Sequence, residues 1–254
     1  MGQKKLDHSE FDTFREFYTK DWQKFVDYNS KDVELVDQLE DKMKLLELCF
    51  TMAYDAKVNF NDVFYQVRTW DAIIYNYLKK KNIVIPPKDR SEKNEKYAGA
   101  YVKEPVPGVY DWVVSFDLNS LYPHLIMGYN ISPETLLDEK HPTVSVDKIL
   151  SKQLDFSDYK DYAVCPNGAM YRKDVRGFLP ELMEKMYNER VIYKKKMLEE
   201  EQRLEDGNYK NKEEVVNNIS KFNNVQMAKK ILLNSAYGAL ANQYFLYYSP
   251  EQAE

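Results

Sequence analysis

The sequence has few of the residues that build disulfides or zinc sites. Only two cysteines, Cys49 and Cys165, occur in 254 residues, far apart and outside any Cys-x-x-Cys pattern. The three histidines, His8, His124 and His141, are equally scattered. The composition therefore indicates neither a disulfide framework nor a zinc site, and it fits a reduced, cytoplasmic compartment.

Long apolar runs and an excess of positive charge are also missing. No run approaches the ~20 apolar residues that cross a bilayer, and the N-terminal residues lack the apolar stretch of a signal peptide. We therefore expect no membrane partner. The formal net charge of −5 argues mildly against a nucleic-acid partner, because phosphate-binding surfaces are usually basic. The local field where phosphates would lie matters more than this total, however.

The first half of the chain predicts helices followed by a strand. Apolar positions recur at helical spacing over residues 4–55, and a second helix is predicted over 60–78. Residues 83–99 are rich in proline and charge, which is typical of a linker or an exposed excursion. The segment VYDWVVSFDL is rich in strand-forming residues and predicts a strand that ends at Asp117.

The last third predicts two long helices. One covers residues 179–205 and stops at the Asp206-Gly207 turn, and the other covers 212–241. Two long helices joined by a short polar turn form an antiparallel hairpin. Helices, a strand-bearing core and a helical hairpin together predict an α+β fold.

Asp117 is the first candidate for chemistry. An apolar strand that ends on a carboxylate and then turns sharply holds that carboxylate at a sheet edge, where it suits a site for Mg²⁺ and substrate phosphates. The turn at residues 118–121 leaves backbone N–H groups free to point at an anion. An ordinary strand-to-helix turn with Asp117 as a cap explains the same residues equally well.

The second candidate is a polar stripe on the last helix, formed by Gln226, Lys230, Asn234 and Tyr237. Their spacing places these side chains on one helical face. A cation, two amides and an aromatic ring are unusual for either a core face or a solvated face. A plain polar face that ends at Gly238 is the alternative.

Arg190 and Lys194 form a cationic i,i+4 pair on the preceding helix. Such pairs are usually solvated surface. In an antiparallel hairpin, however, this pair can lie opposite Lys230, and three cations would then converge on one anion, as in sites that hold a triphosphate.

Two of these segments resemble motifs of the family B DNA polymerases. DLNSLYP at 117–123 resembles motif A of that family, and KILLNSAYG at 230–238 resembles motif B. The surrounding sequence, such as YNISPETL and CPNGAMYRKD, is similar to that of the replicative polymerases of T-even-like bacteriophages. Tyr28 and Asp32, in YNSKD, resemble the third motif of the 3′→5′ exonuclease in that family. The resemblance covers almost the whole chain.

The resemblance implies a partial right-hand polymerase, with a palm sheet segment, a long antiparallel helical fingers hairpin and a helical N-terminal part. It implies five segments in chain order: the end of the 3′→5′ exonuclease domain, an N-terminal-domain segment, the first palm segment, the fingers and the start of the second palm segment. Their expected bounds are 1–44, 45–87, 88–177, 178–242 and 243–254.

The resemblance also implies a two-metal reaction on deoxynucleoside triphosphates. The catalytic residue would be Asp117, which would bind both Mg²⁺ ions, and the Leu118 carbonyl would be a further metal ligand. The triphosphate would be held by two backbone amides and three cationic side chains, namely those of Ser120, Leu121, Arg190, Lys194 and Lys230.

The remaining implied roles concern the sugar, the base and the partners. Tyr122 would stack under the deoxyribose and exclude a 2′-hydroxyl. Asn234 would lie close to the triphosphate, and Tyr237 would face the minor-groove side of the nascent base pair. The implied partners are a DNA primer-template, deoxynucleoside triphosphates, a C-terminal palm and thumb segment that this chain lacks, and a sliding clamp. In a phage-encoded protein the compartment would be the host cytoplasm.

The sequence departs from the family pattern in three places. His124 stands where motif A commonly has serine, and we expect this to change local packing rather than chemistry. Motif C, Tyr-x-Asp-Thr-Asp-Ser, is absent, and no Asp-x-Asp occurs. The first two exonuclease motifs, which we expect before residue 1, are missing as well. Asp32 and Glu34 superficially match the first of them, but on a helix their side chains would diverge too far to share a metal, so we interpret Glu34 as a surface residue. Two-metal catalysis needs a second carboxylate to hold ions about 3.5–4 Å apart, so we expect the isolated chain to be inactive.

The sequence thus predicts a polymerase fragment, from either a partial reading frame or a split polymerase. A non-catalytic nucleotide-binding or DNA-binding module that keeps motifs A and B is the rival from another class. A helical scaffold with chance matches is the third alternative. A Tyr-x-Asp-Thr-Asp-Ser sequence directly downstream would distinguish the first from the second.

Overall fold

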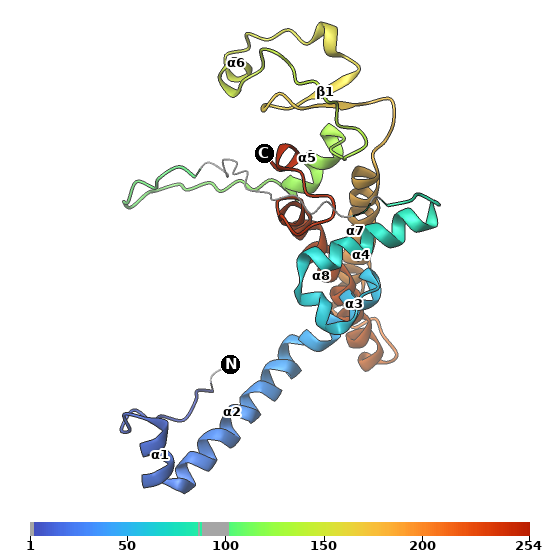
Figure 1. Cartoon of the computed structure of the whole chain (residues 1–254). Helices are drawn as coiled ribbons and strands as arrows, with labels where there is room; N and C mark the ends of the chain where they lie inside the picture. The colour runs from blue at the N-terminus through green and yellow to red at the C-terminus, as the bar shows by residue number, and fades with distance from the viewer. Residues whose placement is uncertain (1–2, 86, 88–101) are drawn as a thin grey trace. The chain divides into compact units, whose positions relative to one another are not determined.

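A computed structural model describes residues 3–85, 87 and 102–254 (Figure 1). The chain divides into two compact units, Met1–Phe50 and Thr51–Glu254. Most of the linker predicted at 83–99 lies outside the described residues. None of the helices in the described ranges combines the length and the apolar character that a membrane span requires.

The first unit is built on two helices, α1 (Phe14–Lys20) and α2 (Trp22–Met43). The side chains of Thr13 and Asp21 accept hydrogen bonds from first-turn N–H groups and so cap them. Lys44 ends α2 in the left-handed conformation. The prediction of one helical region over 4–55 was therefore wrong for residues 4–13. It was also wrong at Asp21 and Lys44, where local caps interrupt the helix.

The second unit begins with three helical pieces, the last of which carries a buried tryptophan. These are α3 (Leu45–Ala56, which starts in the first unit), the 3₁₀ helix η1 (Phe60–Phe64) and α4 (Gln66–Lys80). The helix predicted over 60–78 is thus divided at Tyr65, whose extended backbone separates η1 from α4. Trp70 is 1% exposed, and its indole N–H donates to Ser235 of α8 at 3.0 Å.

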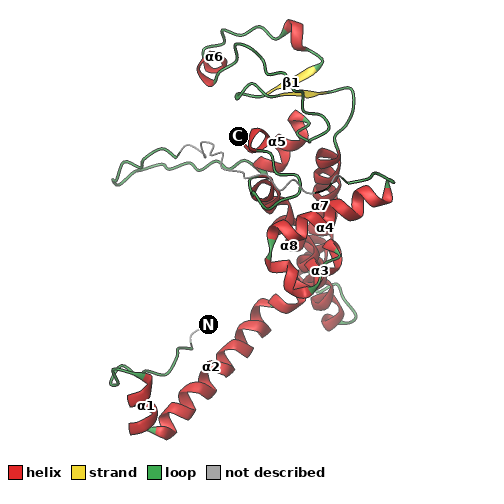
Figure 2. Cartoon of the chain, viewed as in Figure 1, coloured by secondary structure: helices red, strands yellow, loops and turns green. Residues whose placement is uncertain are grey.

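The strand predicted before Asp117 does not form. Residues 102–118 are drawn as loop throughout in Figure 2, and Val109, Trp112 and Phe116 are 92% exposed or more. A strand is defined by hydrogen bonds to a neighbour, and no described segment pairs with this one. The segment leads into α5 (Leu121–Tyr129).

A small antiparallel sheet follows α5 instead. Its strands are β1 (Tyr162–Val164) and β2 (Met170–Arg172), with Ala163 opposite Tyr171. The connection before them carries two short helices, α6 (Val146–Leu150) and η2 (Ser157–Tyr159). The described part of the chain is mostly helical with this one small sheet, which agrees with an α+β fold in its coarse form.

The helical hairpin is the largest packed feature of the second unit. Helices α7 (Phe178–Glu205) and α8 (Lys212–Leu240) run antiparallel and side by side (Figure 1), as the sequence predicted. Gly207, with φ +66°, makes the turn after α7, and Asn211 caps α8 through two backbone N–H groups. A short helix, α9 (Pro250–Ala253), packs against α8.

The start of α7 is fixed by the loop after α5. The Asn130 side chain accepts a hydrogen bond from the N–H of Gly177 and donates to the carbonyls of Arg172 and Val175. Glu134 accepts from the N–H of Phe178 at 2.5 Å. A carboxylate at a helix N-terminus also opposes the positive end of the helix dipole. The hairpin is thereby held to the segment that follows motif A.

Candidate nucleotide site between the turn after Asp117 and the helical hairpin

The turn after Asp117 presents a helix N-terminus without a side-chain cap. Ser120 is the N-cap residue of α5 in a left-handed conformation, with φ 52° and ψ 52°, and its side chain accepts no hydrogen bond from the first turn. A non-glycine residue in this region stores strain of about 1–3 kcal/mol. The first N–H groups of α5, among them that of Leu121, therefore remain available to an anion.

Tyr122 lies against the last helix of the hairpin. Its ring stacks on the ring of Tyr237, with centroids 4.5 Å apart and planes 5° apart. Tyr122 remains 40% exposed. This contact joins the turn after Asp117 to α8, which are more than 100 residues apart in the sequence.

Two further hydrogen bonds join the same turn to α7. Arg190 donates from Nη1 to the Ser120 hydroxyl at 3.2 Å, and Asn119 donates to the Tyr187 hydroxyl at 3.1 Å. The Nε of Arg190 is buried and has no hydrogen-bond partner in the described part of the chain. A buried donor left without a partner costs stability.

His124, the departure within motif A, packs between α5 and α7. Its ring meets the Tyr187 ring edge to face, with centroids 4.8 Å apart, and its Nδ1 lies 2.9 Å from the Ser120 carbonyl oxygen. This bond requires the proton on Nδ1. The histidine therefore links the carbonyl of Ser120 to the Tyr187 ring of α7.

The other cations and the amide of the predicted site face solvent. Lys194, Lys230 and Asn234 are exposed, and the two lysines form no ion pair within the described residues. Gln226, the first member of the stripe, is 7% exposed and donates to Asn223. The stripe is therefore buried at Gln226 and exposed at Lys230 and Asn234.

Asp117 and Leu118 lie in the exposed segment before the turn. Within the described residues no group of three or more His, Cys, Asp or Glu side chains could hold a metal ion. Asp117 forms no ion pair there either, so its two oxygens are free for a ligand. One carboxylate and a carbonyl fit Mg²⁺ when phosphate oxygens complete the coordination.

The exonuclease-like residues lie in the first unit. Tyr28 packs in an aromatic cluster with His8 and Phe17, and Asp32, one turn later on α2, accepts a hydrogen bond from Lys5 at 3.0 Å. The other oxygen of Asp32 is buried without a partner in the described residues. Glu34 is exposed, as predicted for a surface residue.

Sequence reasoning missed a buried ion cluster on the hairpin. Lys229, the neighbour of Lys230, is 4% exposed and binds both oxygens of Asp55 at 3.1 Å and one oxygen of Glu189 at 2.5 Å. Burial lowers the pKa of Lys229, but the hydrogen bonds and charges of Glu189 and Asp55 outweigh burial and raise the pKa above its usual value. Nothing in the local sequence distinguishes Lys229 from Lys230, because the partners of Lys229 come from other helices.

Comparison with known proteins places the chain in a family. The model of DNA polymerase family B matches residues 64–254. The chain is 35% identical to a DNA-directed DNA polymerase of Escherichia phage RB69 and 34% identical to that of Enterobacteria phage T4, each over 91% of this chain and 30% of the relative. It is 30% identical to DNA polymerase 1 of Sulfolobus acidocaldarius, over 96% of this chain and 27% of the relative.

The turn and hairpin that meet at Tyr122 and Tyr237 lie inside the matched region. The chain belongs to DNA polymerase family B. It spans about 30% of the length of the phage relatives.

Proposed function

We propose that this chain is the part of a DNA-directed DNA polymerase that receives the incoming deoxynucleoside triphosphate. The parent reaction adds deoxynucleotides to a primer 3′ end by two-metal phosphoryl transfer. The observation that supports it best is the stack of Tyr122 on Tyr237, because it brings a motif A turn to a motif B helix. The bond from Arg190 to Ser120 supports the same juxtaposition.

The triphosphate would lie at the N-terminus of α5. The backbone amides of Ser120 and Leu121 would donate to phosphate oxygens there, and Arg190 would contribute its unpartnered Nε. Lys194, Lys230 and Asn234, which are exposed on the hairpin, would complete the phosphate contacts. Preorganised cations and amides of this kind stabilise the charge that develops during phosphoryl transfer.

Asp117 and the Leu118 carbonyl would hold Mg²⁺ together with the triphosphate. When bound, the two ions supply charge neutralisation and activation of the primer 3′-hydroxyl. The second carboxylate would come from a motif C segment, which this sequence does not contain. The Tyr122 ring would pack under the sugar, and Tyr237 would face the minor-groove side of the new base pair.

The proposed partners are a primer-template, deoxynucleoside triphosphates and a palm and thumb segment that carries motif C. A sliding clamp is a further proposed partner. By analogy with the phage relatives, the proposed place of action is the cytoplasm of an infected host. We also propose that Tyr28 and Asp32 belong to the end of an exonuclease domain, and that the five domain bounds given above hold.

Primer extension tests the proposal in two arms. The 254-residue chain alone, with Mg²⁺ and all four deoxynucleotides, should extend no primer and degrade no single-stranded DNA. The same chain, co-expressed with a motif C and thumb segment from a phage relative, should extend a primer. Extension by the isolated chain clearly above its Asp117→Ala variant would overturn the fragment interpretation. Nucleotide binding without extension in the completed protein would favour a non-catalytic binding module.

A further inference from the structure

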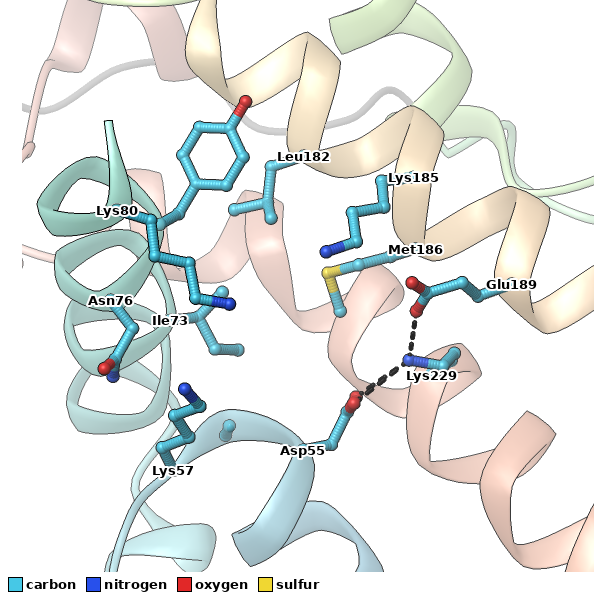
Figure 3. A pocket seen from close by; sticks show the side chains of 12 residues that line it. Asp55, Lys57, Ile73, Asn76, Lys80, Leu182, Lys185, Met186, Glu189 and Lys229 are labelled. Atoms are coloured by element: carbon cyan, nitrogen blue, oxygen red, sulfur yellow. Dashed lines mark hydrogen bonds and ion pairs between the residues drawn. The ribbon is translucent and has the colours of Figure 1, made fainter.

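A small cavity in the second unit lies outside the proposed nucleotide site. It has a volume of about 120 Å³ and is lined by the end of α3, by α4 and α7, and by one residue of α8 (Figure 3). A water molecule takes up ~30 Å³ in the liquid, so the cavity has room for a group of several heavy atoms. None of the residues proposed to hold the nucleotide lines it.

Three lysines from three different elements meet at this cavity. Lys57 follows α3, Lys80 lies in the last turn of α4, and Lys185 is on α7. Their ammonium groups are directed into the cavity (Figure 3). All three are exposed, and none forms an ion pair within the described part of the chain. Like charges repel, so an anion between the three ammonium groups would favour this arrangement.

The attraction of a helix C-terminus for cations does not explain why Lys80 is directed into the cavity. The C-terminus of α4 favours a cation, yet Lys79, which lies in the same last turn, points elsewhere. The Lys79 ammonium lies 5.7 Å from the centre of the Tyr75 ring, and Lys79 does not line the cavity. The two neighbouring lysines therefore form a matched pair, one inside the cavity and one outside.

The carboxylates at the cavity are already occupied. Asp55 and Glu189 both bind Lys229, at 3.1 Å and 2.5 Å, as the dashed lines of Figure 3 show. With Lys229 counted, four lysines face two carboxylates, which leaves an excess of two positive charges. This local excess occurs in a chain whose formal net charge is −5.

We propose that the cavity binds a dianionic phosphate group, either inorganic phosphate or the terminal phosphate of a mononucleotide. A phosphate monoester carries a charge of about −1.5 to −2 at pH 7, which matches the excess of positive charge. Its oxygens accept from several ammonium groups at once, and lysine binds phosphate as a compact point charge. A phosphodiester, with a single charge, would leave part of the repulsion in place.

The test measures phosphate binding to the 254-residue chain by calorimetry and by the rise in melting temperature. The variant Lys57→Gln/Lys80→Gln/Lys185→Gln should weaken the binding of inorganic phosphate at least tenfold and remove the phosphate-dependent rise. In phosphate-free buffer its melting temperature should equal or exceed that of the unaltered chain, because three mutually repelling charges are gone. Lys80→Gln alone should weaken phosphate binding, and the matched Lys79→Gln should not.

A second variant separates this cavity from the nucleotide site. Arg190→Gln/Lys194→Gln/Lys230→Gln should keep the phosphate binding that the cavity variant loses. The proposal would be overturned if the nucleotide-site variant lost phosphate binding and the cavity variant kept it. It would also be overturned if the chain bound dimethyl phosphate, which carries one charge, as tightly as inorganic phosphate. If the proposal holds, tighter binding of deoxyadenosine monophosphate than of phosphate identifies a nucleotide as the source. Equal binding identifies free phosphate.

Discussion

The hairpin of α7 and α8 and the segment 102–118 differ in their backbone hydrogen bonds and in the burial of their apolar side chains. The helices bond their backbone internally, and α8 alone buries Leu232, Leu233 and Ala236 to 4% exposure or less. The segment before α5 has a similarly apolar sequence, yet Trp112 is 98% exposed. A helix needs only its own residues for hydrogen bonds, whereas a strand needs a second segment.

This difference separates two kinds of functional residue. The residues of the proposed site that lie on packed helices, such as Arg190 and Tyr237, already make contacts with the motif A turn. Asp117, in the unpaired segment, makes no ion pair with any described residue. The hairpin therefore contacts the turn within this chain, whereas Asp117 would find its partners only in the metal ions and the further segment of the proposed function.

The largest expected effect concerns Asp117. In the polymerase completed with a motif C segment, Asp117→Ala should reduce primer extension roughly a thousandfold or more, because metal coordination contributes several kcal/mol to transition-state stabilisation. In the isolated chain the same change should leave the melting temperature unaltered, since Asp117 is exposed. Single-turnover extension and thermal unfolding measure the two effects. A stability loss without an activity loss would make Asp117 a cap rather than a metal ligand.

The next largest effect compares two apolar residues directly. Leu233→Ala in α8, where the side chain is 1% exposed, should cost about 2–5 kcal/mol of unfolding free energy. Phe116→Ala, at a residue that is 92% exposed, should stay within about 0.5 kcal/mol. Urea unfolding of the 254-residue chain measures both. In the completed polymerase Phe116→Ala should become costly if the segment pairs there as a strand, and an unchanged small cost would contradict that pairing.

The sequence predicted these two regions unequally for the same physical reason. The hairpin was predicted from its apolar periodicity, the Asp206-Gly207 turn and the helix length, which are all local signals. The strand before Asp117 was predicted from composition, but its formation depends on a partner that local sequence does not describe. The capping of α7 by Glu134 and the pairing of Lys229 with Asp55 were missed because both join distant segments.

The candidate site was predicted in part from spacing and mainly from resemblance. Spacing alone left Asp117, the stripe on α8 and the Arg190 pair each with an ordinary structural explanation. The structure brings Ser120 to Arg190 and Tyr122 to Tyr237. It leaves Lys194 and Lys230 exposed, so their convergence on a triphosphate stays a prediction.

A prediction for Lys230 sharpens the comparison within the hairpin itself. Lys230→Ala in the completed polymerase should weaken deoxynucleotide use at least about tenfold, because a charge-assisted hydrogen bond is worth roughly 1.5–3 kcal/mol. Primer-template affinity should change little. Lys195→Ala is the matched control, since Lys195 is also exposed on the hairpin and forms an ion pair with Glu199 at 3.8 Å. Equal kcat/KM values for the Lys230 and Lys195 variants would remove Lys230 from the site.

The smallest expected effect on deoxynucleotide use, and the most specific, concerns Tyr122 at the junction of the two regions. Its ring stacks on Tyr237, and the residue stays 40% exposed. If the ring excludes a 2′-hydroxyl, Tyr122→Val in the completed polymerase should raise the ratio of ribonucleotide to deoxynucleotide kcat/KM. Loss of the aromatic pair should cost about 0.5–1.5 kcal/mol of stability, which Tyr237→Leu should cost as well. An unchanged ratio with the same stability loss in both variants would mean that Tyr122 only packs.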